Sequence, residues 1–130
     1  YAQSKLAQMM FGYELQRRIK AAGKNVEVQV CHPGASRTNL LMDTASTFNK
    51  ILWAVMSRVI AQSAEKGAWP EVMCATEQGL QSAALYGPTK RANTVGPVDQ
   101  NKLDSIALNQ DMAAKLWTLS LDKTSLNWSL

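Results

Sequence analysis

The chain has 130 residues, of which 46% are hydrophobic and 18% are charged, and its formal net charge is +4. This hydrophobic content is typical of a globular protein and excludes a disordered chain. The cations are scattered in short pairs such as Arg17 and Arg18 or Lys90 and Arg91. A nucleic-acid partner is therefore not indicated, since binding DNA or RNA requires a basic stripe.

The cysteines, the histidine and the apolar runs exclude further classes. Cys31 and Cys74 are widely separated and make no disulfide framework, so we expect two reduced, largely buried thiols in a cytoplasmic protein. His32 is the single histidine and has no cysteine cluster beside it, which argues against a zinc site. The longest apolar stretch, 51–56, is far shorter than the ~20 residues that a membrane span needs.

Residues 1–23 are predicted to form an amphipathic helix, because apolar side chains recur at three- and four-residue steps. Gly23 is a suitable C-terminal stop. Gly12 is unusual in a helix interior and indicates either a close helix–helix approach or a tolerated poor helix former. Two neighbouring stripes follow these steps: Leu6, Met10, Tyr13 and Arg17 lie along one, and Phe11, Leu15 and Ile19 along the other.

A strand is predicted over 26–31, where three valines alternate with Glu27 and Gln29. The strand ends at the sequence His32-Pro33-Gly34, because proline cannot continue a ladder and glycine permits a turn with positive φ. A helix that leads directly into a strand favours an α/β fold.

The next segments are read as an irregular or partly helical stretch at 35–50 and a helix at 51–62 with a broad apolar face. A further helix is predicted to begin near Ser63, which is a suitable N-cap. Pro70 is expected to kink or restart this helix, and Gly79 closes the segment.

The rest of the chain is predicted to contain a short strand, a loop and a final helix. The strand covers 82–88 and ends in a Gly-Pro turn. The polar stretch 89–104, with its second Gly-Pro pair, is predicted to be a loop. The periodic apolar residues of 105–124 predict the closing helix.

The first five residues, "YAQSK", carry a candidate acid/base pair. Residues four apart on a helix project from the same face, with Cβ atoms about 5–6 Å apart. A phenol has a reference pKa near 10, and a nearby ammonium favours the phenolate. Tyr1 and Lys5 are therefore suited to moving a proton to or from an alcohol or carbonyl oxygen. The spacing alone is also met by an aromatic residue at a helix start followed by a solvated lysine.

The ordered set formed by "YAQSK" at 1–5 and "VEVQVCHPGASRTNL" at 26–40 resembles the short-chain dehydrogenase/reductase family. The later stretches "SAEKGAWPEVMCATE", "LYGP" and "DMAAKLWTLSLDKT" are similar to members related to retinol dehydrogenases. The resemblance implies an α/β fold, namely the C-terminal part of a Rossmann-like doubly wound parallel sheet. Residues 1–130 would form a single partial domain that lacks the N-terminal dinucleotide-binding half.

The resemblance also implies roles for individual residues. Tyr1 would be the catalytic general acid/base, and Lys5 would assist it and hydrogen-bond the ribose of NAD or NADP. Pro33, Gly34 and Thr38 would lie beside the cofactor. The side chains that would line the site of a small-molecule alcohol or carbonyl substrate, or else belong to ordinary core packing, are Leu40, Leu41, Met42 and Trp53.

The family's glycine-rich phosphate loop and its catalytic serine have no counterpart in this sequence. The chain begins at Tyr1 rather than at a methionine, so we expect the natural protein to begin further upstream. We expect these 130 residues alone to bind no dinucleotide and to be inactive. The uncovered strand 26–31 should favour a homo-oligomer, with the first helix around Gly12 as a possible contact.

Two other readings are open. One is a fragment of a sugar-nucleotide epimerase or dehydratase, since these relatives share the Tyr-x-x-x-Lys pair. The other is a non-enzymatic dimerisation or regulatory module derived from the family. The sequence does not identify the substrate. It does not choose between NAD and NADP either, because the acidic or basic residue that discriminates between them lies in the missing half.

Overall fold

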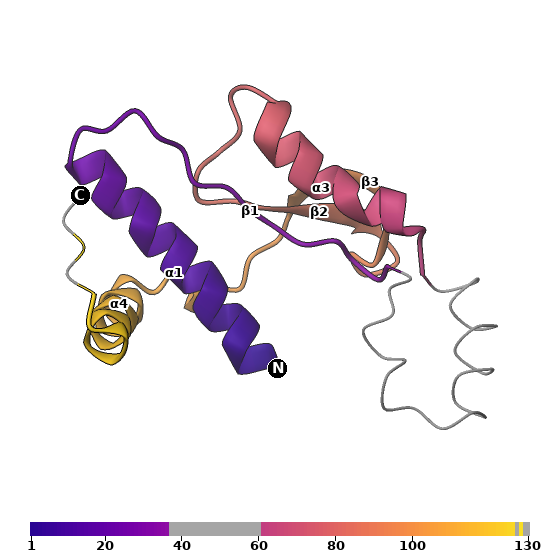
Figure 1. Cartoon of the computed structure of the whole chain (residues 1–130). Helices are drawn as coiled ribbons and strands as arrows, with labels where there is room; N and C mark the ends of the chain where they lie inside the picture. Colours follow the sequence, from indigo (N-terminus) through magenta and orange to yellow (C-terminus); the bar gives the residue numbers. More distant parts are fainter. Residues whose placement is uncertain (37–60, 127, 129–130) are drawn as a thin grey trace. The chain divides into compact units, whose positions relative to one another are not determined.

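The computed structural model describes residues 1–36, 61–126 and 128 (Figure 1). The predictions made for 37–60 lie outside these residues. The described chain separates into two compact units. We call them the helical unit (Tyr1–Val30, Leu80–Ala84 and Lys102–Leu130) and the sheet unit (Cys31–Gly79 and Leu85–Asn101).

The helical unit is built from α1 (Ala2–Ala21), the short 3₁₀ helix η2 (Ser105–Leu108) and α4 (Gln110–Thr124), and α1 packs against both of the others. Met10, Tyr13 and Trp117 are buried in its core. The Trp117 ring stacks on Phe11 with 4.8 Å between centroids, and the Arg18 guanidinium lies 4.7 Å from its centroid. The predicted helix at 1–23 is confirmed, and its apolar stripe forms this core.

A buried carboxylate in α1 was not predicted. Glu14 is only 3% exposed although it stands among apolar positions. Its side chain forms ion pairs with Arg17 and with Arg18, whose Nε lies 2.7 Å from Glu14 Oε1. Two cations at the i+3 and i+4 positions compensate for the desolvation of the carboxylate.

Gly12 does mark a close approach, but the neighbour is not a helix. A Cβ atom at Gly12 would lie 3.1 Å from Val30 Cγ2 and 3.9 Å from Val28 Cγ1. The face of α1 at Gly12 is thus covered by the chain's own following segment. The close helix–helix packing considered for this position is therefore wrong.

The strand predicted at 26–31 is correctly placed but too long, since β1 covers only Val30–Cys31. Val26 is 55% exposed. The backbone N–H of Val28 donates to the Gln16 side chain, so α1 rather than a partner strand satisfies it. Val28 therefore lies beside α1, before the ladder begins at Val30.

The three strands form one sheet in the order β1-β2-β3, with β2 at Leu85–Lys90 and β3 at Val95–Asn101. The α/β class is confirmed, but β2 and β3 are antiparallel, so the sheet is mixed rather than parallel throughout. The predicted loop at 89–104 is wrong, because it contains β3. Gly96 and Pro97 suggested a turn, yet an edge strand tolerates both, since its outer N–H groups need no partner. The strand predicted at 82–88 begins later, at Leu85.

The helix predicted from Ser63 is confirmed as α3 (Ala64–Thr76), which packs against β2 and β3 (Figure 1). The Ser63 hydroxyl accepts the N–H of Lys66 at 3.3 Å, as an N-cap does. The helix is not restarted at Pro70 but runs through it as one element.

The closing helix predicted at 105–124 is divided at Asn109. The Asp104 carboxylate accepts the N–H of Ile106 at 3.1 Å, which starts η2, and the Asn109 side chain accepts the N–H of Met112 at 3.0 Å, which starts α4. Two N-capping side chains within six residues favour two short elements over one continuous helix.

Candidate active site

The predicted acid/base pair lies on the first turn of α1 in the helical unit. Tyr1 is the N-cap residue, and its carbonyl oxygen accepts the backbone N–H of Lys5 at 3.1 Å and the Ser4 hydroxyl at 2.7 Å. These bonds fix the first turn. The Lys5 ammonium then lies 5.6 Å from the centroid of the Tyr1 ring, so the two side chains share a face, as their spacing predicts.

Both side chains of the pair are open to solvent. Tyr1 is 91% exposed, and none of the described residues hydrogen-bonds its hydroxyl. Lys5 Nζ donates one hydrogen bond, to Gln8 Oε1 at 3.1 Å, one turn further along α1. An ammonium has three N–H donors, so two remain for a ligand. Gln8 orients Lys5 and was not identified from the sequence.

The second predicted piece, the turn at Pro33 and Gly34, belongs to the sheet unit. Gly34 has φ +64°, as the turn prediction requires. A Cβ atom there would also collide with the Thr94 carbonyl oxygen and the Pro88 ring. The adjoining Ala35 N–H donates to Thr94 O at 2.7 Å, which fastens the turn to the β2–β3 hairpin. Gly34 is thus required for both its backbone angle and its lack of a side chain.

His32 supports this turn from within the sheet unit. Its Nδ1 accepts the Gly34 N–H at 3.2 Å, so the neutral ring carries its proton on Nε2, which lies 2.7 Å from the Asn101 amide. The amide atom placed at this contact is Nδ2; we exchange the amide oxygen and nitrogen, because only the oxygen can accept from the Nε2–H group. Burial lowers the pKa of His32, in keeping with a neutral ring. His32 therefore acts in positioning the turn, and Gly87 leaves room for its ring.

The carbonyl oxygen of Pro33 is fully engaged. It accepts the Ser36 hydroxyl and the Gln62 side-chain amide, each at 3.0 Å. A carbonyl oxygen has two lone pairs, so this group holds no further donor. A ligand beside the turn would have to use other backbone or side-chain atoms.

The remaining predicted site residues lie outside the described residues. They are Thr38 and the four apolar residues Leu40, Leu41, Met42 and Trp53. In the part of the chain that the structure describes, no cluster of three or more His, Cys, Asp or Glu side chains could hold a metal ion. Within the same residues, no helix is both long and apolar enough to cross a bilayer.

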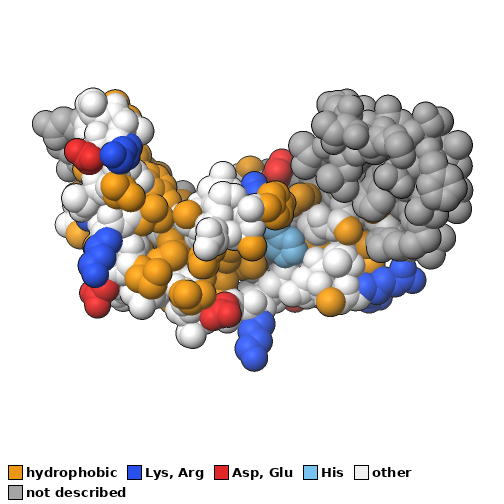
Figure 2. Space-filling view, turned by 90° about the horizontal axis from the view of Figure 1, so that it is seen from below, with side chains coloured by type: hydrophobic (Ala, Val, Ile, Leu, Met, Phe, Trp, Pro, Cys, Tyr) orange, Lys and Arg blue, Asp and Glu red, His pale blue; other side chains and the backbone are white. Residues whose placement is uncertain are grey.

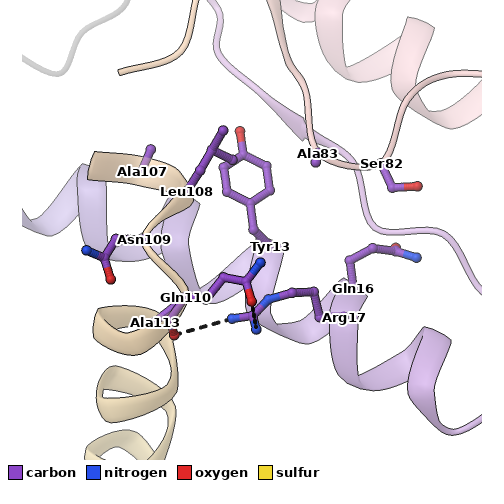
Figure 3. A pocket seen from close by; sticks show the side chains of 10 residues that line it. All are labelled: Tyr13, Gln16, Arg17, Ser82, Ala83, Ala107, Leu108, Asn109, Gln110 and Ala113. Carbon is purple, nitrogen blue, oxygen red and sulfur yellow. Dashed lines mark hydrogen bonds between the residues drawn. The ribbon is translucent and has the colours of Figure 1, made fainter. Parts of the chain in front are cut away.

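A cavity of about 280 Å³ lies in the helical unit, away from Tyr1 (Figure 3). Small side chains such as Ala107 and Ala113 leave this space beside the Tyr13 ring. The Arg17 guanidinium at its edge is already bonded to Glu14 and to Gln110 Oε1 at 3.4 Å. The Tyr13 hydroxyl donates to Ala84 O at 3.2 Å, and burial raises the pKa of Tyr13 to about 12. The ionisable groups here are thus held in structural contacts.

Comparison with known proteins gives the same family as the motifs. Human retinol dehydrogenase 12 is 30% identical over 130 residues, covering 98% of this chain and 37% of that protein. Human polyprenol dehydrogenase is 26% identical over 130 residues, covering 95% of this chain and 35% of that protein. The chain belongs to the short-chain dehydrogenase/reductase family.

A solved structure shares the fold of this dehydrogenase/reductase chain. The crystal structure of an uncharacterised protein from Mycobacterium paratuberculosis matches with a TM-score of 0.71 and 33% identity. The match covers 100% of this chain and 40% of that one. No protein-family model matches the chain. The chain spans about a third of the length of the curated relatives, with 35% and 37% coverage for the two above.

A phosphate cradle for a dinucleotide would need successive backbone N–H groups at a glycine-rich helix start. Among the described helices, neither α3 nor α4 begins with glycines: Ser63 and Asn109 cap them. In the helical unit, Lys5 keeps two N–H donors that no described residue uses.

Proposed function

We propose that the whole protein containing this chain interconverts an alcohol and a carbonyl compound with NAD or NADP. Tyr1 is its general acid/base and Lys5 assists it. The observation that carries the proposal is the 5.6 Å separation between the Lys5 ammonium and the Tyr1 ring, at the head of a helix in a chain of this family. The cofactor supplies or accepts the hydride when bound.

The proton transfer follows from the two side chains. In the reducing direction, the Tyr1 hydroxyl donates its proton to the carbonyl oxygen as negative charge develops there. The phenolate that remains is stabilised by the fixed ammonium of Lys5. In the oxidising direction, the phenolate accepts the alcohol proton. The solvent exposure of Tyr1 allows the proton to be exchanged between cycles.

The cofactor-binding residues proposed in the sheet unit follow β1. In an open α/β sheet, ligands bind beyond the carboxyl ends of the strands, and Pro33 and Gly34 follow the carboxyl end of β1. We propose that these two residues and Thr38 lie beside the nicotinamide. We also propose that the two units are parts of one Rossmann-like domain, whose dinucleotide-binding half is outside these 130 residues.

The substrate proposed is a lipophilic alcohol or its carbonyl counterpart. The names of the relatives identify retinol and polyprenol as their substrates. The four apolar residues predicted to line the site would suit a hydrocarbon chain; they are Leu40, Leu41, Met42 and Trp53.

Self-association is proposed as well. Apolar side chains of η2 and α4 remain on the surface of the helical unit, among them Ile106, Leu108 and Met112, at 42%, 46% and 46% exposure. Figure 2 shows hydrophobic side chains exposed on one face of the molecule. Exposed apolar groups of this kind favour contact with another protein surface. Light scattering of the purified chain should give a mass above that of a monomer, and a monomeric mass would contradict this proposal.

Two experiments test the proposal at separate steps. Calorimetric titration of the 130-residue chain with NADH and with NADPH should show no micromolar binding, because its sequence holds no glycine-rich phosphate loop. The whole protein should bind one of the two and oxidise or reduce a lipophilic alcohol–carbonyl pair. Tight binding of NADH or NADPH by the 130-residue chain would refute the proposal that the phosphate-binding loop lies outside these residues. Loss of activity in a Lys5→Met variant that still binds the dinucleotide would support the role of the pair.

A further inference from the structure

A hollow of about 570 Å³ lies in the sheet unit, beside the start of α3 and the turn of the β2–β3 hairpin, and all of its lining residues belong to that unit. Three of the side chains that line it are cationic: Lys66, Lys90 and Arg91. Trp69 adds an indole ring to the lining. No Asp or Glu is among the described residues that line the hollow, so its positive charge has no counter-charge within it.

Lys66 and Trp69 stand one turn apart on α3. The Lys66 ammonium lies 5.7 Å from the centroid of the Trp69 ring, within the range of a cation–π contact. Trp69 nevertheless remains 43% exposed, so part of its ring is open beside the ammonium. The helix thus offers an apolar surface and a positive charge next to each other.

Lys90 and Arg91 come from the end of β2 and the turn that follows it. A Cβ atom on Gly96 would lie 3.0 Å from both Cβ and Cγ of Lys90, so the Lys90 stem packs across the backbone of β3. The Thr94 N–H donates to Lys90 O at 3.1 Å, and the Thr94 hydroxyl donates to Arg91 O at 2.7 Å. These bonds close the turn and fix the backbone that carries both cations.

The two lysines keep their charge available to a ligand. Neither Lys66 nor Lys90 forms an ion pair with a carboxylate of the residues that the structure describes. Like charges around a hollow repel one another, and an anion bound among them relieves this repulsion. The attraction is stronger in a hollow than on a flat surface, because less water screens it.

We propose that this hollow binds a small organic oxyanion, a carboxylate or a phosphate monoester, that carries a flat apolar body. The oxyanion pairs with Lys66 and Lys90, and the apolar body lies on the open part of the Trp69 ring. The volume of the hollow falls within the range of small-molecule sites, which is about 300–1,000 Å³. The site does not require the acid/base pair, which belongs to the helical unit.

The test uses naphthoate, naphthyl phosphate and the neutral naphthalenemethanol as probes of similar shape. The isotope-labelled 130-residue chain is titrated with each, and NMR follows the indole N–H signal of Trp69, which is assigned by its loss in Trp69→Phe. We expect at least one anion to shift this signal and to bind at least about tenfold more tightly than the alcohol. The tighter of the two anions identifies the group that the site recognises.

Matched variants locate the bound anion. Lys66→Gln and Lys90→Gln each remove one charge from the hollow and should weaken anion binding about five- to tenfold. Lys115→Gln makes the same change at an exposed position of α4, in the helical unit, and should leave the affinity unchanged.

Three results would overturn the proposal of an anion site. They are an unmoved Trp69 signal with both anions at millimolar concentration, equally tight binding of the alcohol, and equal anion affinities in the three lysine variants. The first two are read on the wild-type chain, so they decide the matter even if a variant fails to fold.

Discussion

The side-chain amide of Gln62 donates to the carbonyl oxygen of Lys66 at 3.3 Å, which is the acceptor that Pro70 leaves without a partner. In an α-helix the N–H of residue 70 would bond to the carbonyl of residue 66, but proline has no N–H. Gln62 is 8% exposed and also holds Pro33 O at 3.0 Å. One amide group thus completes α3 and anchors the Pro33 turn.

This relationship predicts the outcome of a double-mutant cycle. Gln62→Leu should lower the free energy of unfolding by about 1–3 kcal/mol, because a buried carbonyl loses its donor. Pro70→Ala restores a backbone donor to Lys66 O, so it should be less harmful in the Gln62→Leu chain than in the wild type. Urea unfolding of all four proteins measures the coupling, expected at about 1 kcal/mol. Additive effects would show that the Gln62 amide does not replace the missing bond.

Two glycines have nearly equal φ angles but different surroundings. Substituting each by alanine therefore distinguishes the cost of backbone strain from the cost of a steric collision. Gly23 has φ +65° with open space around it, whereas Gly34 has φ +64° and faces Thr94 O and Pro88. Gly23→Ala should cost about 1 kcal/mol, the usual penalty for a left-handed non-glycine residue. Gly34→Ala should cost at least about 1–3 kcal/mol more, because the turn must move off the hairpin. Equal losses in thermal unfolding would contradict the close packing of the turn.

His32 predicts a pH dependence of stability. Burial lowers the pKa of His32 below its ordinary value of 6.5, so the unfolded chain binds the proton more readily than the folded one. The neutral ring contributes fully to the free energy of unfolding above pH 6.5. This contribution is lost as the pH falls towards the pKa of His32 in the folded chain. Urea unfolding between about pH 8 and pH 5 measures the slope.

The histidine titration has a built-in control. Because the chain has a single histidine, its ring proton signal in NMR reports this pKa alone. His32→Gln should flatten the stability profile between about pH 6.5 and 5, because it removes the side chain whose ordinary pKa lies in this range. A folded-state pKa at or above 6.5 would contradict the bonding of His32 to Gly34 and Asn101.

Because Glu14 is buried and ion-paired, replacing it should cost more stability than replacing an exposed carboxylate. Glu14→Gln should cost about 1–3 kcal/mol, because Arg17 and Arg18 lose a charged acceptor within the helical unit. Glu77→Gln, at an exposed position that follows α3, should change stability by less than about 0.5 kcal/mol. Similar effects of the two substitutions on urea unfolding would mean that the ion pairs contribute nothing to the core.

The sequence predicted the elements whose signals are local. The periodic apolar residues of α1, the Ser63 cap and the left-handed Gly34 each act within a few residues, and each is confirmed. The length of β1 and the existence of β3 depend on which partner satisfies the backbone, and a local pattern cannot show this. Glu14 could have been recognised, since two arginines follow it at i+3 and i+4.

The candidate site also contains features that local spacing predicts and contacts that it does not predict. The shared face of Tyr1 and Lys5 follows from their spacing, and the geometry agrees with it. The supporting contacts of His32 with Asn101, and of Gln62 with Pro33, join residues far apart in the sequence. No spacing rule predicts them.

The central claim is that the Tyr1 hydroxyl carries the proton of the reaction. The most direct measurement compares kcat/KM of the whole protein with that of Tyr1→Phe. Tyr13→Phe is the matched control, since the Tyr13 hydroxyl donates to the structural carbonyl of Ala84. Tyr1→Phe should lose about 10²–10⁴-fold in kcat/KM while dinucleotide binding is retained, and Tyr13→Phe should remain near wild type. A Tyr1→Phe enzyme within about threefold of wild type would contradict the account, because general acid–base catalysis contributes more than that.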